Sequence, residues 1–152
     1  MTSEELSQLL GSGVYALTLV FNHEEMIPVG SLGCLPFRKG CYVYVGSARA
    51  NLRKRVARHV ASTKTVRWHI DYLTARREVT PTSVVVWLSR TECEVATILK
   101  KTSDGSVPHF GSSDCRCGSH LIYFASSARR LEAICAISPD VSLALPSGTR
   151  GA

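Results

Sequence analysis

The sequence predicts an α+β fold in which a small antiparallel sheet of three strands is flanked by helices. Alternating apolar and polar residues near the N-terminus are typical of half-buried strands. A basic segment with a helical period follows between Arg49 and Ala61. The length of 152 residues, with 45% hydrophobic and 20% charged residues, is that of one folded domain rather than a disordered or coiled-coil chain.

The first half of the chain contains the predicted sheet. Val14–Phe21 and Cys41–Val45 are rich in β-branched and aromatic residues, and Met26–Leu35 is a less regular extended stretch between them. Polar or Gly- and Pro-containing turns separate the three segments. We therefore expect an antiparallel meander.

Helices are predicted after this meander. Leu52, Val56 and Val60 recur at every fourth position among basic residues, which predicts an amphipathic helix over Arg49–Ala61. Thr65 is expected to cap a second helix that continues through Arg77.

The second half alternates between strands and helices. Val84–Leu88 is continuously apolar and predicts a strand buried on both faces. Thr91 has capping-box spacing to Glu94 and is expected to open a helix through Lys101. A strand at Leu121–Phe124 and a helix at Ser127–Ala136 complete a single domain over residues 1–137. Small and turn-forming residues predict a loosely ordered tail over residues 138–152.

The positive charge of the chain is concentrated in one segment. The net charge is +6, but Arg49–Arg77 holds nine basic residues and the single acid Asp71. Such a segment is typical of a surface that follows phosphates, although a solvated helix face explains the charge equally well. The residues predicted to contact nucleic acid, DNA more than RNA, are Arg49, Arg53, Lys54, Arg58 and Arg67.

Two observations predict a cytoplasmic protein with no membrane partner. No apolar run approaches the roughly 18 residues of a membrane span, and Met1–Leu10 lacks the basic region of a secretory signal. The six cysteines are irregularly spaced and are expected to be free thiols.

Ordered short motifs resemble the GIY-YIG nuclease superfamily. They are Gly13-Val14-Tyr15, Tyr44-Val45-Gly46-Ser47, and Arg55 with His59 on the following helix. Segments 67–73, 92–94 and 110–121 are similar to an uncharacterised branch whose members also occur joined to endonuclease III-type DNA glycosylases. The resemblance extends from about Gly13 to Phe124. It implies a GIY-YIG-like fold and phosphodiester hydrolysis.

The resemblance also implies roles for individual residues. Arg55 takes the position of the catalytic arginine, and a guanidinium suits a phosphate because it donates paired hydrogen bonds and keeps its charge. Tyr15 and Tyr44 take the positions of the paired tyrosines, of which either one orients or deprotonates the water. His59 and His69 are expected to carry protons or donate to phosphate.

Glu94 is the predicted ligand of Mg²⁺ or Mn²⁺. Magnesium is commonly held by one or two carboxylates, waters and substrate oxygens. Glu92 lies two positions away on the predicted helix, so the two carboxylates are not expected to reach one ion. The alternative role for Glu94 is that of a capping residue for Thr91.

One residue of the superfamily pattern is missing. An asparagine usually occurs late in the domain, whereas the asparagines here are Asn22 and Asn51. Ser113 and Asp114 are candidates to replace it. The departure favours an alternative function, a non-catalytic nucleic-acid-binding module on the same scaffold.

Cys115, Cys117 and His120 form a second candidate metal site. Thiolate and imidazole are zinc ligands, and Cys93 or Asp114 could supply a fourth group. One intervening residue is shorter than the usual two to four, so packing of small thiols is the favoured interpretation. A third interpretation is that this loop forms a wall of the active site.

The sequence thus predicts a metal-dependent DNA endonuclease directed by DNA structure or damage, in repair or processing, with a possible DNA-repair protein as partner. The alternative is the non-catalytic binding module, with zinc as a possible stabilising ion.

Overall fold

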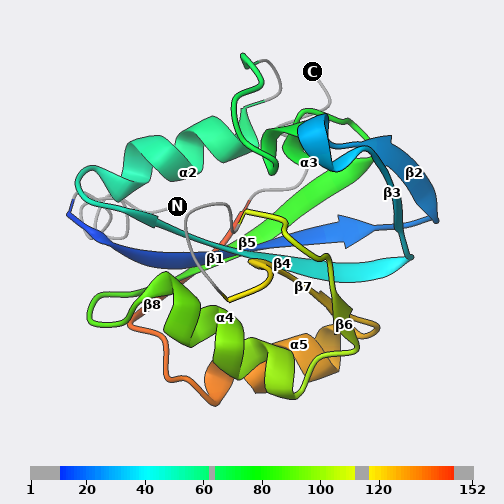
Figure 1. Ribbon diagram of the computed structural model, residues 1–152. Coiled ribbons are helices and arrows are strands. Elements are labelled where there is room, and N and C mark those ends of the chain that lie inside the picture. The colour runs from blue at the N-terminus through cyan, green and yellow to red at the C-terminus, as the bar shows by residue number, and fades with distance from the viewer. Residues whose placement is uncertain (1–10, 62–63, 112–116, 146–152) are drawn as a thin grey trace.

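Six strands form one antiparallel sheet in the computed structural model, which describes residues 11–61, 64–111 and 117–145 (Figure 1). Their order across the sheet is β6-β7-β4-β1-β5-β8. The bounds are Gly105–Ser106 for β6, Leu121–Phe124 for β7, Gly40–Ala48 for β4, Gly13–Phe21 for β1, Val79–Trp87 for β5 and Val141–Ala144 for β8.

The predicted three-stranded meander is wrong in its middle member. Strands β2 (Glu25–Pro28) and β3 (Cys34–Phe37) pair with each other in a separate two-stranded sheet, with the 3₁₀ turn η1 (Gly30–Leu32) between them. Strand β1 already has β4 on one side and β5 on the other. Prolines within β2 and β3 also lack the N–H that a central strand must donate.

The C-terminal prediction also needs correction. Residues predicted to belong to a loosely ordered tail form β8, which pairs with β5 and places Leu143 opposite Val84. Val141 and Leu143 are buried and alternate with exposed residues, so one side of this short strand completes the core. Residues 146–152 lie outside the described part of the chain.

The sheet is covered on both faces. Helices α2 (Leu52–Val60) and α3 (Asp71–Thr74) lie with the β2–β3 hairpin on one face, and α4 (Glu92–Lys101) lies with α5 (Ser127–Cys135) on the other (Figure 1). Side chains of β1 alternate between the layers: Tyr15 and Leu17 pack in the core below α2, whereas Val14 and Ala16 pack in the core of α4 and α5.

The predicted second helix is much shorter than expected. The Asp71 carboxylate accepts hydrogen bonds from the backbone N–H groups of Arg67 and Trp68, so the preceding residues wrap around this side chain rather than forming a helix. Thr65 is not a cap; its carbonyl accepts a hydrogen bond from Arg58.

Other helix starts agree with local sequence chemistry. Asn51 caps α2 from a left-handed conformation, with its side chain accepting from the N–H of Lys54. The predicted cap of α4 is confirmed, because the Thr91 hydroxyl accepts from the N–H of Glu94 at 3.2 Å.

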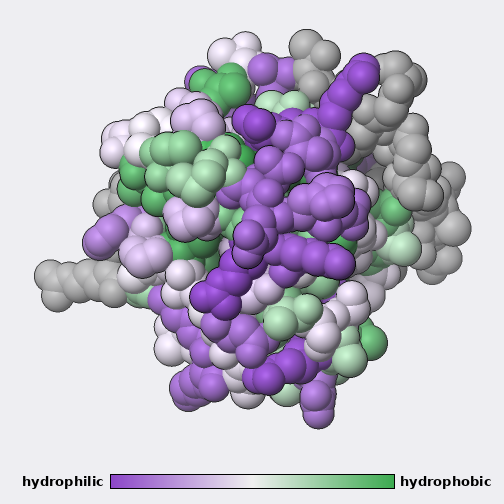
Figure 2. Space-filling model, turned by 90° about the vertical axis from the view of Figure 1, so that its right-hand side faces the viewer, coloured by the Kyte–Doolittle hydropathy of each residue, from purple (hydrophilic) through white to green (hydrophobic). Residues whose placement is uncertain are grey.

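The surface at the right-hand end of Figure 1 is hydrophilic along a band. Figure 2 shows this band running from the α3 side of the molecule to the α5 side, beside a more apolar area. This end lies away from the start of β1 and of α2 (Figure 1). No helix in the described part of the chain is long and apolar enough to cross a membrane.

Candidate active site

The two tripeptide motifs meet on adjacent strands. In the β1–β4 register Tyr15 lies opposite Gly46, and Leu17 lies opposite Tyr44. The two tyrosine rings therefore share one face, with centroids 6.3 Å apart. A Cβ on residue 46 would lie 2.6 Å from the Tyr15 ring, so a glycine is required for this ring to lie across β4.

His59 connects helix α2 to this tyrosine pair. Its Nε2 lies 2.6 Å from the hydroxyl oxygen of Tyr15, and both side chains are almost fully buried. The imidazole is also near the ring of Tyr44, with centroids 5.9 Å apart. Nδ1 of His59 has no hydrogen-bond partner among the described residues. The hydrogen bond thus pairs a phenol with a buried imidazole.

Burial sets the charge state of these groups. Burial raises the pKa of Tyr15, the neighbouring Tyr44 raises it further, and the charge of Arg55 acts in the opposite direction. Burial also raises the pKa of Tyr44. Burial, together with the charge of Lys64, lowers the pKa of His59 to about 3. At neutral pH both phenols are protonated and His59 is neutral.

Glu92 is the acidic residue whose charge affects the pKa values of both tyrosines. Its charge raises the pKa of both Tyr15 and Tyr44, after the larger contribution of burial. Glu94 is exposed, and its carboxylate lies 3.7 Å from Arg90. The charge of Glu92 thus acts on the tyrosine site, and the role of Glu94 as a metal ligand stays a prediction.

Arg55 lies one turn before His59 on α2. Its guanidinium donates to the carbonyl of Ser47 at 3.0 Å and stacks over the Trp68 ring at 4.8 Å. These contacts hold the arginine beside the end of the second motif. Its charge reaches both tyrosines, as the lowering effect on their pKa values shows.

Arg58 has a structural partner. It forms a two-pronged ion pair with the carboxylate of Asp71, at 2.7 and 2.8 Å, and stacks over Trp68 at 4.3 Å. Burial raises the pKa of Asp71, but the hydrogen bonds from Arg58 and from two backbone N–H groups outweigh this effect and hold that pKa below its usual range. The guanidinium of Arg58, predicted to contact nucleic acid, is therefore occupied within the fold.

His69 lies one aromatic ring away from the tyrosines. Its Nδ1 accepts the backbone N–H of Gly111 at 3.0 Å, and its ring packs on Phe110, which in turn contacts the ring of Tyr44. Burial lowers the pKa of His69. The structure thus gives this predicted catalytic residue a contact with the loop before residue 112.

The other predicted nucleic-acid contacts lie on the surface. These residues, on α2 or beside it, are all exposed: Arg49, Arg53, Lys54 and Arg67. Their side chains are accessible to a polyanion, in contrast to that of Arg58.

Cys93, Cys117 and His120 form a compact cluster of metal-ligand type. All their ligand atoms lie within 4.8 Å of one another. Cys93 is one of the two residues, with Asp114, that the sequence analysis named as a possible additional ligand. The third predicted ligand, Cys115, lies outside the described residues, as do Ser113 and Asp114.

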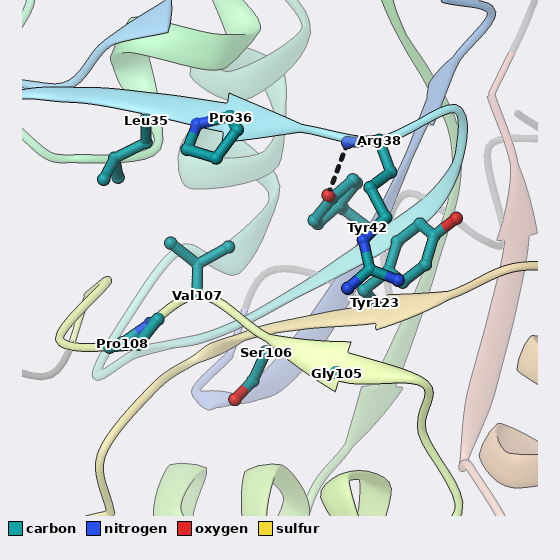
Figure 3. Close-up of a pocket in the computed structure, with 9 residues that line it drawn as sticks. All are labelled: Leu35, Pro36, Arg38, Tyr42, Gly105, Ser106, Val107, Pro108 and Tyr123. Atoms are coloured by element: carbon teal, nitrogen blue, oxygen red, sulfur yellow. Dashed lines mark hydrogen bonds between the residues drawn. The ribbon is translucent and has the colours of Figure 1, made fainter. Parts of the chain in front are cut away.

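A separate pocket of about 260 Å³ opens between β3, β4, β6 and β7 (Figure 3). The guanidinium of Arg38 lies over the Tyr123 ring at 5.1 Å, and its backbone N–H donates to the hydroxyl of Tyr42. None of the predicted catalytic residues lines it. The lining residues are Leu35, Pro36, Arg38, Tyr42, Gly105, Ser106, Val107, Pro108 and Tyr123.

Comparison with known proteins places this arrangement in a family. The family described as "Domain of unknown function DUF123" matches residues 14–143. The chain belongs to the DUF123 family. This DUF123 match includes Tyr15, the second tyrosine motif, helix α2 and the cysteine–histidine cluster. No curated protein and no solved structure matches the chain.

Sequence reasoning missed two residues near the tyrosines of this DUF123 domain, and only one of them carries a signal in the sequence. Asp71 is the single acid in the basic segment, which is a signal for a buried ion-pair partner. Glu92 has no comparable signal, because its orientation depends on how α4 packs against the sheet.

Proposed function

We propose that this protein is a metal-dependent endonuclease that hydrolyses phosphodiester bonds in DNA. The observation that carries the proposal is the 2.6 Å hydrogen bond between the Tyr15 hydroxyl and Nε2 of His59, beside Tyr44. The charge of Arg55 acts on the same tyrosines. The resemblance of these positions to the GIY-YIG motifs supports the same function.

The proposed chemistry begins with orientation of the attacking water. Neutral His59 accepts the hydrogen bond of the Tyr15 hydroxyl at 2.6 Å, so the phenol oxygen is directed to accept a hydrogen bond from the water. The proton that the water loses on attack passes to the leaving oxygen of the DNA strand, and the phenol does not need to ionise. This route fits the raised pKa of Tyr15, which excludes a substantial phenolate population at neutral pH.

Arg55 would stabilise the charge on the phosphoryl oxygens. A guanidinium remains charged throughout the reaction and donates to two oxygens at once. Its contacts with Ser47 and Trp68 orient it without neutralising it by an acid. It is therefore suited to a role that Arg58, paired with Asp71, does not share.

The acidic residue at this site fits a magnesium or manganese ion. Such ions bind through one or two carboxylates together with waters and phosphate oxygens, and Glu92 supplies a carboxylate whose charge reaches both tyrosines. Glu92 would hold the ion. When bound, the ion would supply positive charge to the phosphate.

Exposed cations along α2 would hold the DNA backbone. Arg53 and Lys54 lie on the same helix as Arg55 and His59, so phosphates bound there would lie near the proposed catalytic groups. Contacts of this kind do not read sequence, which favours recognition of DNA shape or damage. We place this activity in the cytoplasm, in repair or processing of DNA.

A nicking assay tests the proposal. Supercoiled plasmid and branched DNA are incubated with the full chain and Mg²⁺ or Mn²⁺, and Arg55→Ala is expected to lower the cleavage rate about 10³-fold, the scale of a lost transition-state donor. Tyr15→Phe is expected to lower it about 10²-fold. Tyr42→Phe is the matched control. Tyr42 lies on the same face of the sheet as Tyr15, but its hydroxyl accepts a hydrogen bond from the backbone N–H of Arg38 instead of contacting His59.

Equal cleavage by the wild type and Arg55→Ala would overturn the proposal. A second candidate, a non-catalytic binding module, is favoured by the burial of Tyr15, which is only 1% exposed. It predicts salt-dependent DNA binding with no metal-dependent cleavage by any variant.

A further inference from the structure

Cys93, Cys117 and His120 meet where the start of helix α4 lies beside the loop before β7. Their sulfur and nitrogen atoms are ligands that soft or borderline metal ions prefer. Sγ of Cys117 lies 2.9 Å from Sγ of Cys93 and 2.8 Å from Nε2 of His120. The remaining separation, between Cys93 Sγ and His120 Nε2, is 3.9 Å. Two thiols and one imidazole thus converge from two segments: Cys93 lies 24 residues before Cys117, and Cys117 lies three residues before His120.

We propose that Cys93, Cys117 and His120 bind a structural zinc ion. Bonds of about 2.3 Å to sulfur and 2.0–2.1 Å to nitrogen put tetrahedral ligand atoms roughly 3.5–3.8 Å apart. Two of the three separations need to widen by less than about 1 Å, which small side-chain rotations supply. A water or one further side chain completes the coordination.

The geometry favours a metal over a disulfide. A disulfide between Cys93 and Cys117 would involve the two sulfurs alone, whereas here the imidazole Nε2 also approaches both of them. Zinc also matches two thiolates and one imidazole better than magnesium or manganese does.

The surrounding backbone holds each ligand in place. Cys93 lies in the first turn of α4. The carbonyl of Cys117 accepts a hydrogen bond from Lys100 near the other end of the same helix. His120 accepts the N–H of Val45 through its carbonyl and donates its own N–H to Phe110.

These contacts define what the ion would do. Zinc bound here ties the start of α4 to the loop before β7, and through the 2.9 Å hydrogen bond of Val45 to the strand that carries Tyr44 and Gly46. The ion would therefore fix the orientation of two elements that border the tyrosine site. The proposal is independent of nuclease activity, because it requires only that the fold holds zinc.

Metal analysis of the full chain tests the proposal. After purification with reductant and no added metal, elemental mass spectrometry is expected to find about one zinc per chain in the wild type. Cys93→Ser and Cys117→Ser are each expected to retain less than about a fifth of that zinc. Cys135→Ser is the matched control and keeps the full content, because Cys135 is exposed at the end of α5.

A spectroscopic measurement on the wild type protects the test against variants that fail to fold. Cobalt exchanged for zinc is expected to show the visible bands of a tetrahedral site with thiolate ligands, and X-ray absorption of the zinc form is expected to show both sulfur and nitrogen ligands. A wild type without zinc that also rejects cobalt, or a metal shell of oxygen atoms alone, would overturn the proposal. Neither readout depends on DNA cleavage, so failure of the proposed function is a separate result.

Discussion

The two faces of the sheet bury different kinds of side chain. On the face covered by α2 and α3, the core includes His59, Asp71 and Thr74 with their polar partners. On the opposite face, α4 and α5 pack mainly through aliphatic residues such as Val95 and Leu99. Buried polar groups are costly unless they are paired, whereas aliphatic burial stabilises a fold directly. The comparison indicates that the face covered by α2 and α3 holds the paired polar groups on which the proposed function depends, whereas the core under α4 and α5 is mainly apolar.

The largest expected effect comes from breaking the ion pair on the polar face. Asp71→Asn leaves the guanidinium of Arg58 without its charged partner, so we expect the free energy of unfolding to fall by about 3–5 kcal/mol in urea denaturation. Glu78→Gln removes the partner of Arg76 in an exposed pair and is expected to cost less than about 1 kcal/mol. Similar losses for the two variants would show that the buried pair has no special weight.

A cavity in the core under α4 and α5 is expected to lower the free energy of unfolding without changing the rate of DNA nicking. Leu99→Ala removes a fully buried side chain of α4 and should lower the free energy of unfolding by about 2–4 kcal/mol. The rate of DNA nicking per folded molecule should stay within about twofold of the wild type. A large loss of nicking at full folding would contradict the division between the two faces.

Titration of His59 sharpens the comparison through pH. The folded-state pKa of about 3 lies below the ordinary value near 6.5, so the unfolded chain binds the proton first as pH falls. The contribution of neutral His59 to the free energy of unfolding is therefore present above about pH 6.5 and is lost progressively as pH falls toward 3. The free energy of unfolding is expected to fall by about 2 kcal/mol between pH 7.5 and pH 5.

His59→Gln provides the reference for this titration. Glutamine can keep a hydrogen bond to Tyr15 but does not titrate, so its unfolding free energy should lack the wild-type decrease between pH 7.5 and pH 5. Parallel stability curves for the two proteins would show that His59 does not carry the pH dependence.

The smallest expected effect concerns the exposed cations. Arg53→Ala should weaken DNA binding by roughly three- to tenfold at low salt and reduce the dependence of binding on salt concentration, measured by fluorescence anisotropy. Lys101→Ala serves as the control, because it removes an equal charge from an exposed position of α4, on the other side of the sheet. Equal weakening by both variants would indicate a general charge effect rather than a DNA surface on α2.

Local patterns predicted the elements whose stability is local. Thr91 predicted the start of α4, and the spacing of Leu52 and Val56 predicted the buried face of α2. Both predictions hold because capping and helical periodicity act within a few residues. The helix predicted from Thr65 was wrong because the Asp71 carboxylate captures backbone N–H groups that a helix would use otherwise. This competition depends on Arg58, thirteen residues away.

The candidate site shows the same division. Tyr15, Tyr44, Arg55 and His59 were predicted as a group, but the hydrogen bond that distinguishes Tyr15 from Tyr44 follows from how α2 packs on β1. Glu94 was predicted as the ligand from its place on the helix, but the sequence does not show which side of the first turn of α4 faces the sheet.

The sequence alone determined the local features of this protein: strand and helix periodicity, the Thr91 cap of α4 and the concentration of positive charge between Arg49 and Arg77. Each depends on residues close together along the chain. Only the tertiary structure decided that six strands join one sheet, that Glu92 acts on the tyrosines, and that Cys93 meets Cys117 and His120. These outcomes depend on the packing of distant segments, whose combined burial outweighs the preference of any single segment.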